Sequence, residues 1–295
     1  MAGDGLIAVT GATGEVGGRV ARRLAERGIE QRLVVRDPSR APDLEGAEVA
    51  QASDYEARDE MEAALKGAHT LFLVSGEEAR NRVDQHKAVV DAAVAAGVER
   101  IVYLSFFGAA PDCAFTFGRD HFHTEEHIRA SGVGFAFSRD NIYVDYVPIF
   151  AGADGAIRGP AGEGRFAPVA RDDVADVAVE LITDRSHDGR AYDVTGPEAY
   201  TMAEAAERLG RAIGREITYV DETIEEAWAS RRPTGHPDWE IAGWVTSYTA
   251  IAEGELDGLT TTVKDLTGHD PQTLEEFLER HPESYEHLMR GSSEE

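Results

Sequence analysis

The sequence is poor in cysteine, in lysine and in long apolar runs, and each shortage excludes a class of protein. A single cysteine, Cys113, allows no internal disulfide, which is typical of a reducing compartment. No window approaches the uninterrupted apolar length that a membrane span needs, and the start of the chain lacks the basic segment of a secretory signal. We therefore expect a soluble, cytoplasmic protein.

Positive charge is also scarce. The 295 residues carry 55 acidic against 29 basic side chains, a formal net charge of −26. Nucleic acids and anionic membranes need a basic face on their partner, so we exclude both. The excess of acid is typical of a strongly solvated surface, against which a phosphorylated cofactor must be met by a local group of arginines.

Short apolar runs alternate with helical patterns through the first 150 residues. The alternation predicts βαβ units, and we expect an α/β fold with a Rossmann-type, doubly wound parallel sheet covered by helices on both faces. The expected strands are Leu6–Thr10, Gln31–Val35, Glu48–Ala50, Thr70–Val74, Arg100–Leu104 and Gly134–Ser138. The expected helices lie at about 16–28, 56–66, 80–96 and 121–130.

From about residue 151 the pattern changes to glycine-rich connections and mostly helical segments. Helices are expected at about 172–183, 202–213 and 222–230, and short strands at 191–194 and 217–220. Thr201 and Glu204 form a capping box for the second helix. We divide the chain into an NAD(P)-binding Rossmann domain, 1–150, and a smaller C-terminal substrate lobe, 151–295, some of whose strands could return to the sheet. The loop at 154–164 is either a lid or a plain connection.

A glycine-rich turn joins the first expected strand to the first helix. Its GxxGxxG spacing lets the backbone approach a pyrophosphate, while the helix N-terminus supplies free N–H groups and the positive end of a dipole. Because the motif follows a strand and opens a helix with an apolar stripe, we expect it to bind a dinucleotide. The residues concerned are Gly11, Thr13, Gly14, Glu15, Val16 and Gly17.

The end of the second strand decides between NAD and NADP. An acidic residue there would bind the ribose 2′-hydroxyl, and an arginine would bind a 2′-phosphate. Arg36 and Arg40 favour NADP(H) over NAD(H), because Asp37 before Pro38 is better explained as a helix cap. The ends of the third and fourth strands should meet the adenine and the nicotinamide half. They add Ser53, Asp54, Tyr55, Val74, Ser75 and Gly76 to the expected cofactor site.

Five segments form a recognisable set: VTGATGEVGGRVARRL, VVRDPSR, RIVYLSFFGA, HFHTEEHIRASGVGFAFSRDNIY and IRGPAGEGRFAPVARDDVADVA. Together they resemble the NmrA-like branch of the atypical short-chain dehydrogenases/reductases, and within it the type 2 NAD(P)H:quinone oxidoreductases. The resemblance covers essentially the whole chain and implies a Rossmann fold and an NAD(P)H cofactor. It is much less specific for the substrate.

The catalytic pair of an ordinary short-chain dehydrogenase, Tyr-x-x-x-Lys, is absent from the helix after the fifth strand. The lysines of the chain are Lys66, Lys87 and Lys264, and none follows a tyrosine by four residues. The two positions hold Phe117 and His121, while the serine that ends the fifth strand is present as Ser105. Alcohol dehydrogenation through a phenol of lowered pKa is therefore excluded, and an acceptor that needs little acid catalysis is favoured.

Aromatic and imidazole side chains remain in the expected cleft. His121 is the expected proton donor because its ordinary pKa lies near neutrality, with Tyr143 and Ser105 as further catalytic candidates. Phe106 and Phe107 could stack on a flat acceptor, although one of two adjacent strand residues normally points into the core. The expected substrate contacts are Phe106, Phe107, His123 and Tyr143, and Asn141 is counted with the cofactor site.

Two features leave the site open to other interpretations. Asp145 and Tyr146 stand where the quinone reductases usually carry Glu-Asn, so the floor of the pocket is undetermined. His123 and His127 have the four-residue spacing of metal ligands on a helix, but no strand or loop supplies a third ligand, and we expect no metal.

One function is preferred, with two alternatives. We expect an NAD(P)H-dependent oxidoreductase that transfers hydride from NADPH to a small-molecule partner, a quinone or similar conjugated carbonyl. The first alternative is a non-catalytic NAD(P) redox sensor of the NmrA type. The second is a tailoring reductase or epimerase of specialised metabolism. All three need the cofactor site, so the sequence does not separate them, and it leaves the oligomeric state open.

Overall fold

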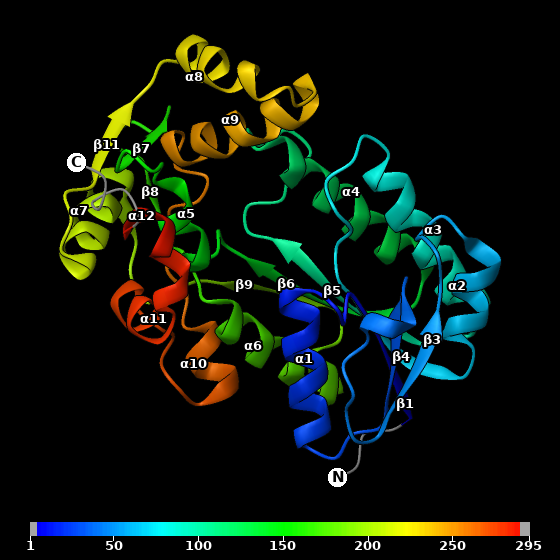
Figure 1. Ribbon diagram of the computed structural model, residues 1–295. Coiled ribbons are helices and arrows are strands. Elements are labelled where there is room, and N and C mark those ends of the chain that lie inside the picture. The colour runs from blue at the N-terminus through cyan, green and yellow to red at the C-terminus, as the bar shows by residue number, and fades with distance from the viewer. Residues whose placement is uncertain (1–4, 290–295) are drawn as a thin grey trace.

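The computed structural model describes residues 5–289 and contains a seven-stranded sheet with helices on both faces (Figure 1). The strand order is β3-β2-β1-β4-β5-β6-β9, and every neighbouring pair is parallel. The strands are β1 (Leu6–Thr10), β2 (Gln31–Val35), β3 (Ala47–Gln51), β4 (Ala68–Leu73), β5 (Arg100–Phe106), β6 (Gly134–Asp140) and β9 (Arg190–Val194). The predicted Rossmann-type α/β fold is confirmed.

Two apolar cores, one on each face of the sheet, hold these layers together. In β1 the side chains of Ile7 and Val9 enter one core, and Ala8 enters the other. A strand buried on both faces is apolar throughout, which explains the uninterrupted apolar run that marked it in the sequence. The first core lies under α1 (Glu15–Glu26) and α6 (Arg171–Thr183), and the second lies under α2 (Arg58–Leu65), α3 (Arg82–Ala95) and α4 (Thr116–Ser131).

The strand order reverses between β1 and β4. The chain winds outward from β1 through β2 to β3, then crosses to β4 and winds the other way. Connections leave the sheet in opposite directions at this point, so a crevice opens at the carboxyl ends of β1 and β4. The fold therefore presents a ligand site at the end of β1, where the glycine turn begins.

The second half of the chain contributes to the sheet and also builds a separate core. After α6 and β9 complete the sheet, most of the remaining elements gather at its carboxyl edge around Phe166, Leu209 and Tyr248 (Figure 1). These elements are α5 (Val147–Phe150), β7 (Ala156–Gly159), β8 (Arg165–Phe166), β10 (Tyr200–Thr201), α7 (Met202–Ile213), β11 (Thr218–Asp221), α9 (Asp238–Ala252), α11 (Leu274–Arg280) and α12 (Glu286–Met289). Helix α8 (Ile224–Arg231) packs on α9 through Ala227, and helix α10 (Thr262–Thr267) places Val263 in the first core of the sheet. No helix within residues 5–289 has both the length and the apolar character to cross a bilayer.

Local sequence signals set most element boundaries. The capping box of Thr201 and Glu204 is present at α7, and Asp37 accepts a hydrogen bond from the Ser39 N–H at the predicted turn. Two expectations are wrong. Strand β7 lies inside the segment 154–164, where a loop was expected, and pairs with β11. Helix α4 begins at Thr116 rather than near residue 121, because no capping side chain marks its first residue, and His121 is therefore a buried residue of its second turn.

Candidate active site

The carboxyl ends of the central strands open into a cavity of about 830 Å³. Most of the predicted site residues line it: Gly11, Thr13, Gly14, Glu15, Val16, Gly17, Arg36, Asp54, Tyr55, Val74, Ser75, Gly76, Ser105, Phe106, His121, Asn141 and Tyr143. Four predicted residues, Arg40, Ser53, Phe107 and His123, lie outside its lining. Phe107 packs instead against the C-terminal core, and His123 is exposed on α4.

The glycine turn has the close backbone contacts that a pyrophosphate site needs. Gly11 has a positive φ of 65°, and a Cβ on Gly17 would lie 2.3 Å from the Gly11 carbonyl oxygen. Gly14 caps α1 without a side-chain hydrogen bond, so no side chain at this cap occupies the first N–H groups of the helix. The helix N-terminus offers free N–H groups and the positive end of the helix dipole, and the glycine positions beside it leave room for a ligand. This arrangement fits the phosphates of a dinucleotide.

Arg36 extends from the end of β2 into the mouth of the cavity. Its guanidinium lies 3.0 Å from the Glu77 carboxylate, and the side chains are 66% and 83% exposed. An ion pair between two exposed side chains is weak, so this guanidinium can exchange Glu77 for a phosphate. Arg40 lies in the short turn Pro38–Arg40 outside the cavity lining, so Arg36 is the one of the two predicted cofactor arginines that lines the cavity.

Buried side chains from α3 hold the loop after β4. The Gly76 N–H donates to Nε2 of His86 at 2.8 Å, and Nε of Arg82 donates to the Gly76 carbonyl oxygen at 2.9 Å. The Tyr55 hydroxyl donates to the Val74 carbonyl oxygen at 2.8 Å. The predicted cofactor loop therefore has a fixed backbone. His86 and Arg82 were not predicted from the sequence, because a helical pattern does not distinguish a buried polar residue from an exposed one.

Ser105 is committed to a buried ion pair. Its hydroxyl donates to Oε1 of the fully buried Glu125 at 2.6 Å, and Arg139 binds the same carboxylate through Nε and Nη2 at 2.7 and 2.5 Å. A serine has a single hydroxyl proton. Ser105 can therefore accept a hydrogen bond from a ligand in the cavity but has no proton left to donate to one.

His121 is buried and uncharged at neutral pH. Its Nδ1 lies 3.0 Å from the Tyr103 hydroxyl oxygen. Burial, together with the charge of Arg82 and the neighbouring His86, lowers the pKa of His121 well below its ordinary value. The expectation that His121 titrates near neutrality is therefore wrong, and the imidazole can act as a hydrogen-bond donor rather than as an imidazolium acid. Phe106 lies beside it, with ring centroids 6.0 Å apart.

Asp140, Arg171 and an aromatic wall also line the cavity, and of these residues only Phe117 and Tyr146 had been connected with the site from the sequence. Burial raises the pKa of Asp140 to about 7, and its Oδ1 has no hydrogen-bond partner among residues 5–289. Its carboxyl interacts with the Tyr143 hydroxyl, and Arg171 lies over the Tyr143 ring, 4.8 Å from the centroid. Asp140 ends β6, so the rule that ligands meet the carboxyl ends of strands could have identified it. The wall consists of Phe115, Phe117, Tyr146, Phe150 and Trp244.

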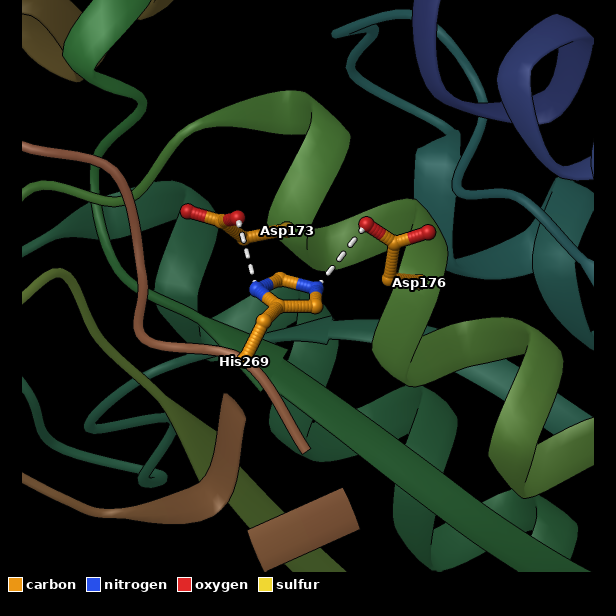
Figure 2. Close-up of side chains that lie close together, drawn as sticks. All are labelled: Asp173, Asp176 and His269. Carbon is orange, nitrogen blue, oxygen red and sulfur yellow. Dashed lines mark ion pairs between the residues drawn. The ribbon is translucent and has the colours of Figure 1, made fainter. Parts of the chain in front are cut away.

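One group of ligand-type side chains lies apart from the cavity. Figure 2 shows the His269 imidazole between two carboxylates of α6, with Nδ1 4.0 Å from Asp173 and Nε2 3.3 Å from Asp176. Asp176 also binds Nε of Arg23 at 2.6 Å. A hydrogen bond to the Asp270 carbonyl and the nearby carboxylates raise the pKa of His269. Because each nitrogen faces a different carboxylate, the group is an ion-pair bridge that fastens the segment after α10 to α6.

Comparisons with known proteins extend over nearly the whole chain. The model of the NmrA-like family matches residues 3–278. The NAD(P)H azoreductase of Xenophilus azovorans is 32% identical over 95% of this chain and 99% of its own length, and quinone oxidoreductase 2 of Escherichia coli is 32% identical over 92% and 97%.

Two solved structures of similar reductases also superimpose on nearly the whole chain. The NADPH-dependent quinone oxidoreductase of Escherichia coli, complexed with NADPH, superimposes with a TM-score of 0.85 at 30% identity, covering 93% of this chain and 99% of that one. The triphenylmethane reductase of Citrobacter sp., complexed with NADP(H), gives a TM-score of 0.82 at 28% identity, with the same coverage. The family resemblance that five sequence segments indicated is thereby confirmed.

Proposed function

Because this chain belongs to the NmrA-like family, we propose that it is an NADPH-dependent oxidoreductase that reduces a quinone or a similar flat, conjugated carbonyl. The observation that carries the proposal is one continuous cavity that joins the glycine turn, Arg36 and the buried His121. The similar proteins named above include a quinone oxidoreductase, an azoreductase and a triphenylmethane reductase. Quinones, azo compounds and triphenylmethane dyes are all extended conjugated systems.

The cofactor end of the cavity would be held largely by the backbone. The N-terminus of α1 and the glycine turn would bind the pyrophosphate, and Arg36 would bind the 2′-phosphate of NADPH. The loop after β4, fixed through Gly76, would support the nicotinamide half. The bound dihydronicotinamide supplies the hydride.

The acceptor end is apolar, with few polar groups. Phe106 and Phe115, whose ring centroids lie 4.9 Å apart, form one side, and Trp244 of α9 lines the same cavity. Aromatic faces of this kind suit a flat conjugated ring and exclude water from it. His121 would donate a hydrogen bond to the acceptor oxygen as that oxygen gains negative charge. Because a hydroquinone phenolate is a weak base, no Tyr-x-x-x-Lys pair is needed to protonate it.

Steady-state NADPH oxidation with a panel of quinones tests this proposal, together with calorimetric binding of NADPH and NADH. We expect turnover with quinones and tighter binding of NADPH than of NADH. His121→Ala should lower kcat/KM for the quinone by about 10- to 100-fold, which corresponds to the loss of one hydrogen bond to a charged oxygen, about 1.5–3 kcal/mol. NADPH affinity should stay unchanged in this variant.

His127→Ala is the matched control. His127 lies on the same helix, outside the cavity lining, with Nε2 2.8 Å from the Asp91 carboxylate, and its loss should leave turnover as in the wild type. NADPH binding without turnover on any acceptor would favour the redox-sensor alternative. Absence of dinucleotide binding would contradict the proposal.

A further inference from the structure

We propose that Tyr103 and His86 are positioning residues that hold His121 in the tautomer with hydrogen on Nε2, so that the cavity receives an N–H donor. The inference deepens the proposed function: the use of this donor rests on that function, but the tautomer itself does not. It is carried by a chain of buried hydrogen bonds in which each donor is determined by its neighbour.

The chain begins at a backbone group that can only donate. The Gly76 N–H points at Nε2 of His86, with 2.8 Å between the nitrogens. Nε2 must therefore carry a lone pair and accept. Because burial and the charge of Arg82 lower the pKa of His86 to about 3, its ring is neutral and the single hydrogen lies on Nδ1.

The next two groups leave this hydrogen one principal acceptor. Nδ1 of His86 lies 2.8 Å from the Thr124 hydroxyl oxygen, whereas the Tyr103 hydroxyl oxygen is 3.5 Å away. The Thr124 hydroxyl donates its own proton to the Asp120 carbonyl oxygen at 2.8 Å, a bond within α4. The Thr124 hydroxyl oxygen therefore accepts a hydrogen bond from Nδ1 of His86, and its own proton is donated within α4.

The Tyr103 hydroxyl then has two neighbouring acceptors, Nδ1 of His121 and the Thr124 hydroxyl oxygen. The Thr124 oxygen already accepts the His86 hydrogen, so Nδ1 of His121 is the acceptor with a free lone pair. His86 Nδ1 carries a hydrogen and cannot accept, so the hydroxyl proton of Tyr103 points to Nδ1 of His121, 3.0 Å away. The phenol keeps its proton, because complete burial raises the pKa of Tyr103 above its ordinary value. Nδ1 of His121 is thus an acceptor.

A neutral imidazole that accepts at Nδ1 carries its hydrogen on Nε2. His121 lines the cavity, and its ring lies beside Phe106 at the acceptor end. In the proposed reaction, hydride adds at one end of the conjugated acceptor, the π electrons shift along the ring to the carbonyl oxygen at the other end, and the Nε2–H hydrogen bond stabilises the phenolate charge that forms there. His121 keeps its proton, and water supplies the proton that completes the product.

The first donor of the chain belongs to the cofactor loop. Gly76 lines the same cavity as His121, so the backbone that would support the nicotinamide also sets the tautomer of the group that would meet the acceptor. The support of the nicotinamide and the hydrogen bond to the acceptor are thereby joined through His86 and Tyr103, without either residue touching the reacting atoms.

Nitrogen-15 NMR of the histidine-labelled apoprotein tests the inference without any turnover. The His121 resonances are assigned by their loss in His121→Asn. We expect Nε2 to be the protonated, pyrrole-type nitrogen and Nδ1 the unprotonated, pyridine-type one. The opposite assignment would overturn the proposal, and this wild-type measurement stands even where a variant fails to fold.

Tyr103→Phe keeps the ring and removes the donor. We expect His121 to lose its single tautomer and kcat for a quinone to fall about tenfold, the loss for one hydrogen bond of about 1.4 kcal/mol, with the Kd for NADPH unchanged. An unchanged tautomer in this variant would overturn the positioning role. Tyr192→Phe is the matched control, because Tyr192 bonds Nδ1 of His187 at 2.6 Å outside the cavity lining, and it should leave both readouts unchanged.

The two proposals fail separately. The expected His121 tautomer in an apoprotein that reduces no acceptor would support the positioning role and contradict the proposed reductase. Quinone turnover together with the Nδ1–H tautomer would contradict the positioning role and leave the reductase standing.

Discussion

The hydroxyl of Ser105 lies 2.6 Å from Oε1 of Glu125, a carboxylate that is fully buried. Arg139 neutralises this carboxylate, and the serine proton completes its solvation. In an ordinary short-chain dehydrogenase the serine at this strand end would form a hydrogen bond with the substrate. Here its proton is donated to a buried carboxylate, so our proposal assigns the hydrogen bond to the acceptor to His121 instead.

Ser105→Ala should therefore affect stability more than turnover. Removing one hydrogen bond to a buried charge costs about 1–3 kcal/mol of unfolding free energy. Urea unfolding should show this loss, while kcat with a quinone changes by less than about threefold. A tenfold fall in kcat with unchanged stability would instead make Ser105 a direct substrate contact.

The sequence predicts the architecture well because the determining signals are local or periodic. Strands buried on both faces, such as β1 with Val9 and Ala8 in opposite cores, are continuous apolar runs. The glycine turn is recognisable because its backbone cannot tolerate a side chain at Gly17. Thr201 and Glu204 mark the start of α7 through their own hydrogen bonds.

The polar interior of the site could not be predicted in this way. Whether His86 faces solvent or Gly76 depends on how α3 packs on the sheet, and its neighbours in the sequence do not encode that contact. The pKa of His121 depends on burial and on Arg82, which lies 39 positions earlier in the chain. Asp140 directly precedes Asn141, which was predicted, but its importance arises from the apolar neighbours that desolvate it.

Arg36→Ala should reduce discrimination between the two nicotinamide cofactors. The guanidinium at the end of β2 can form an ion pair with the 2′-phosphate of NADPH, but the 2′-hydroxyl of NADH has no charge for it to pair with. We expect the Kd for NADPH to rise about tenfold or more, which corresponds to at least about 1.4 kcal/mol, while the Kd for NADH stays nearly constant. Calorimetry with both cofactors measures the two values.

Arg40→Ala is the control for this experiment, because Arg40 carries the same charge four residues further on, outside the cavity lining. A general effect of positive charge would weaken NADPH binding in both variants. An equal loss in Arg36→Ala and Arg40→Ala would contradict the assignment of the phosphate contact to Arg36.

Two glycine substitutions in the same turn should separate folding from binding. A Cβ on Gly17 would lie 2.3 Å from the Gly11 carbonyl oxygen, so Gly17→Ala forces α1 away from β1 and should lower the thermal midpoint as well as abolish NADPH binding. A Cβ on Gly14 would meet its nearest heavy atom, the same oxygen, at 3.3 Å. Gly14→Ala should therefore fold normally and weaken NADPH binding alone, because its methyl group enters the cavity. Thermal unfolding and calorimetry on both variants measure this difference, and an equal loss of stability in the two variants would contradict it.

Asp140→Asn should change the pH dependence of stability. The pKa of this carboxyl is about 7 in the folded protein and about 3.9 in an unfolded chain. The folded state therefore binds the proton more tightly, and stability falls as pH rises between these two values, until the buried carboxylate is charged.

Asparagine keeps the shape of the side chain and cannot ionise. At pH 8 the variant should be more stable than the wild type by on the order of 4 kcal/mol, and the difference should shrink as pH falls toward 5. Urea unfolding between pH 5 and 8 measures the effect, with the exposed Asp112→Asn as control. A stability difference that is constant across this range would mean that Asp140 is already charged in the folded protein at pH 5.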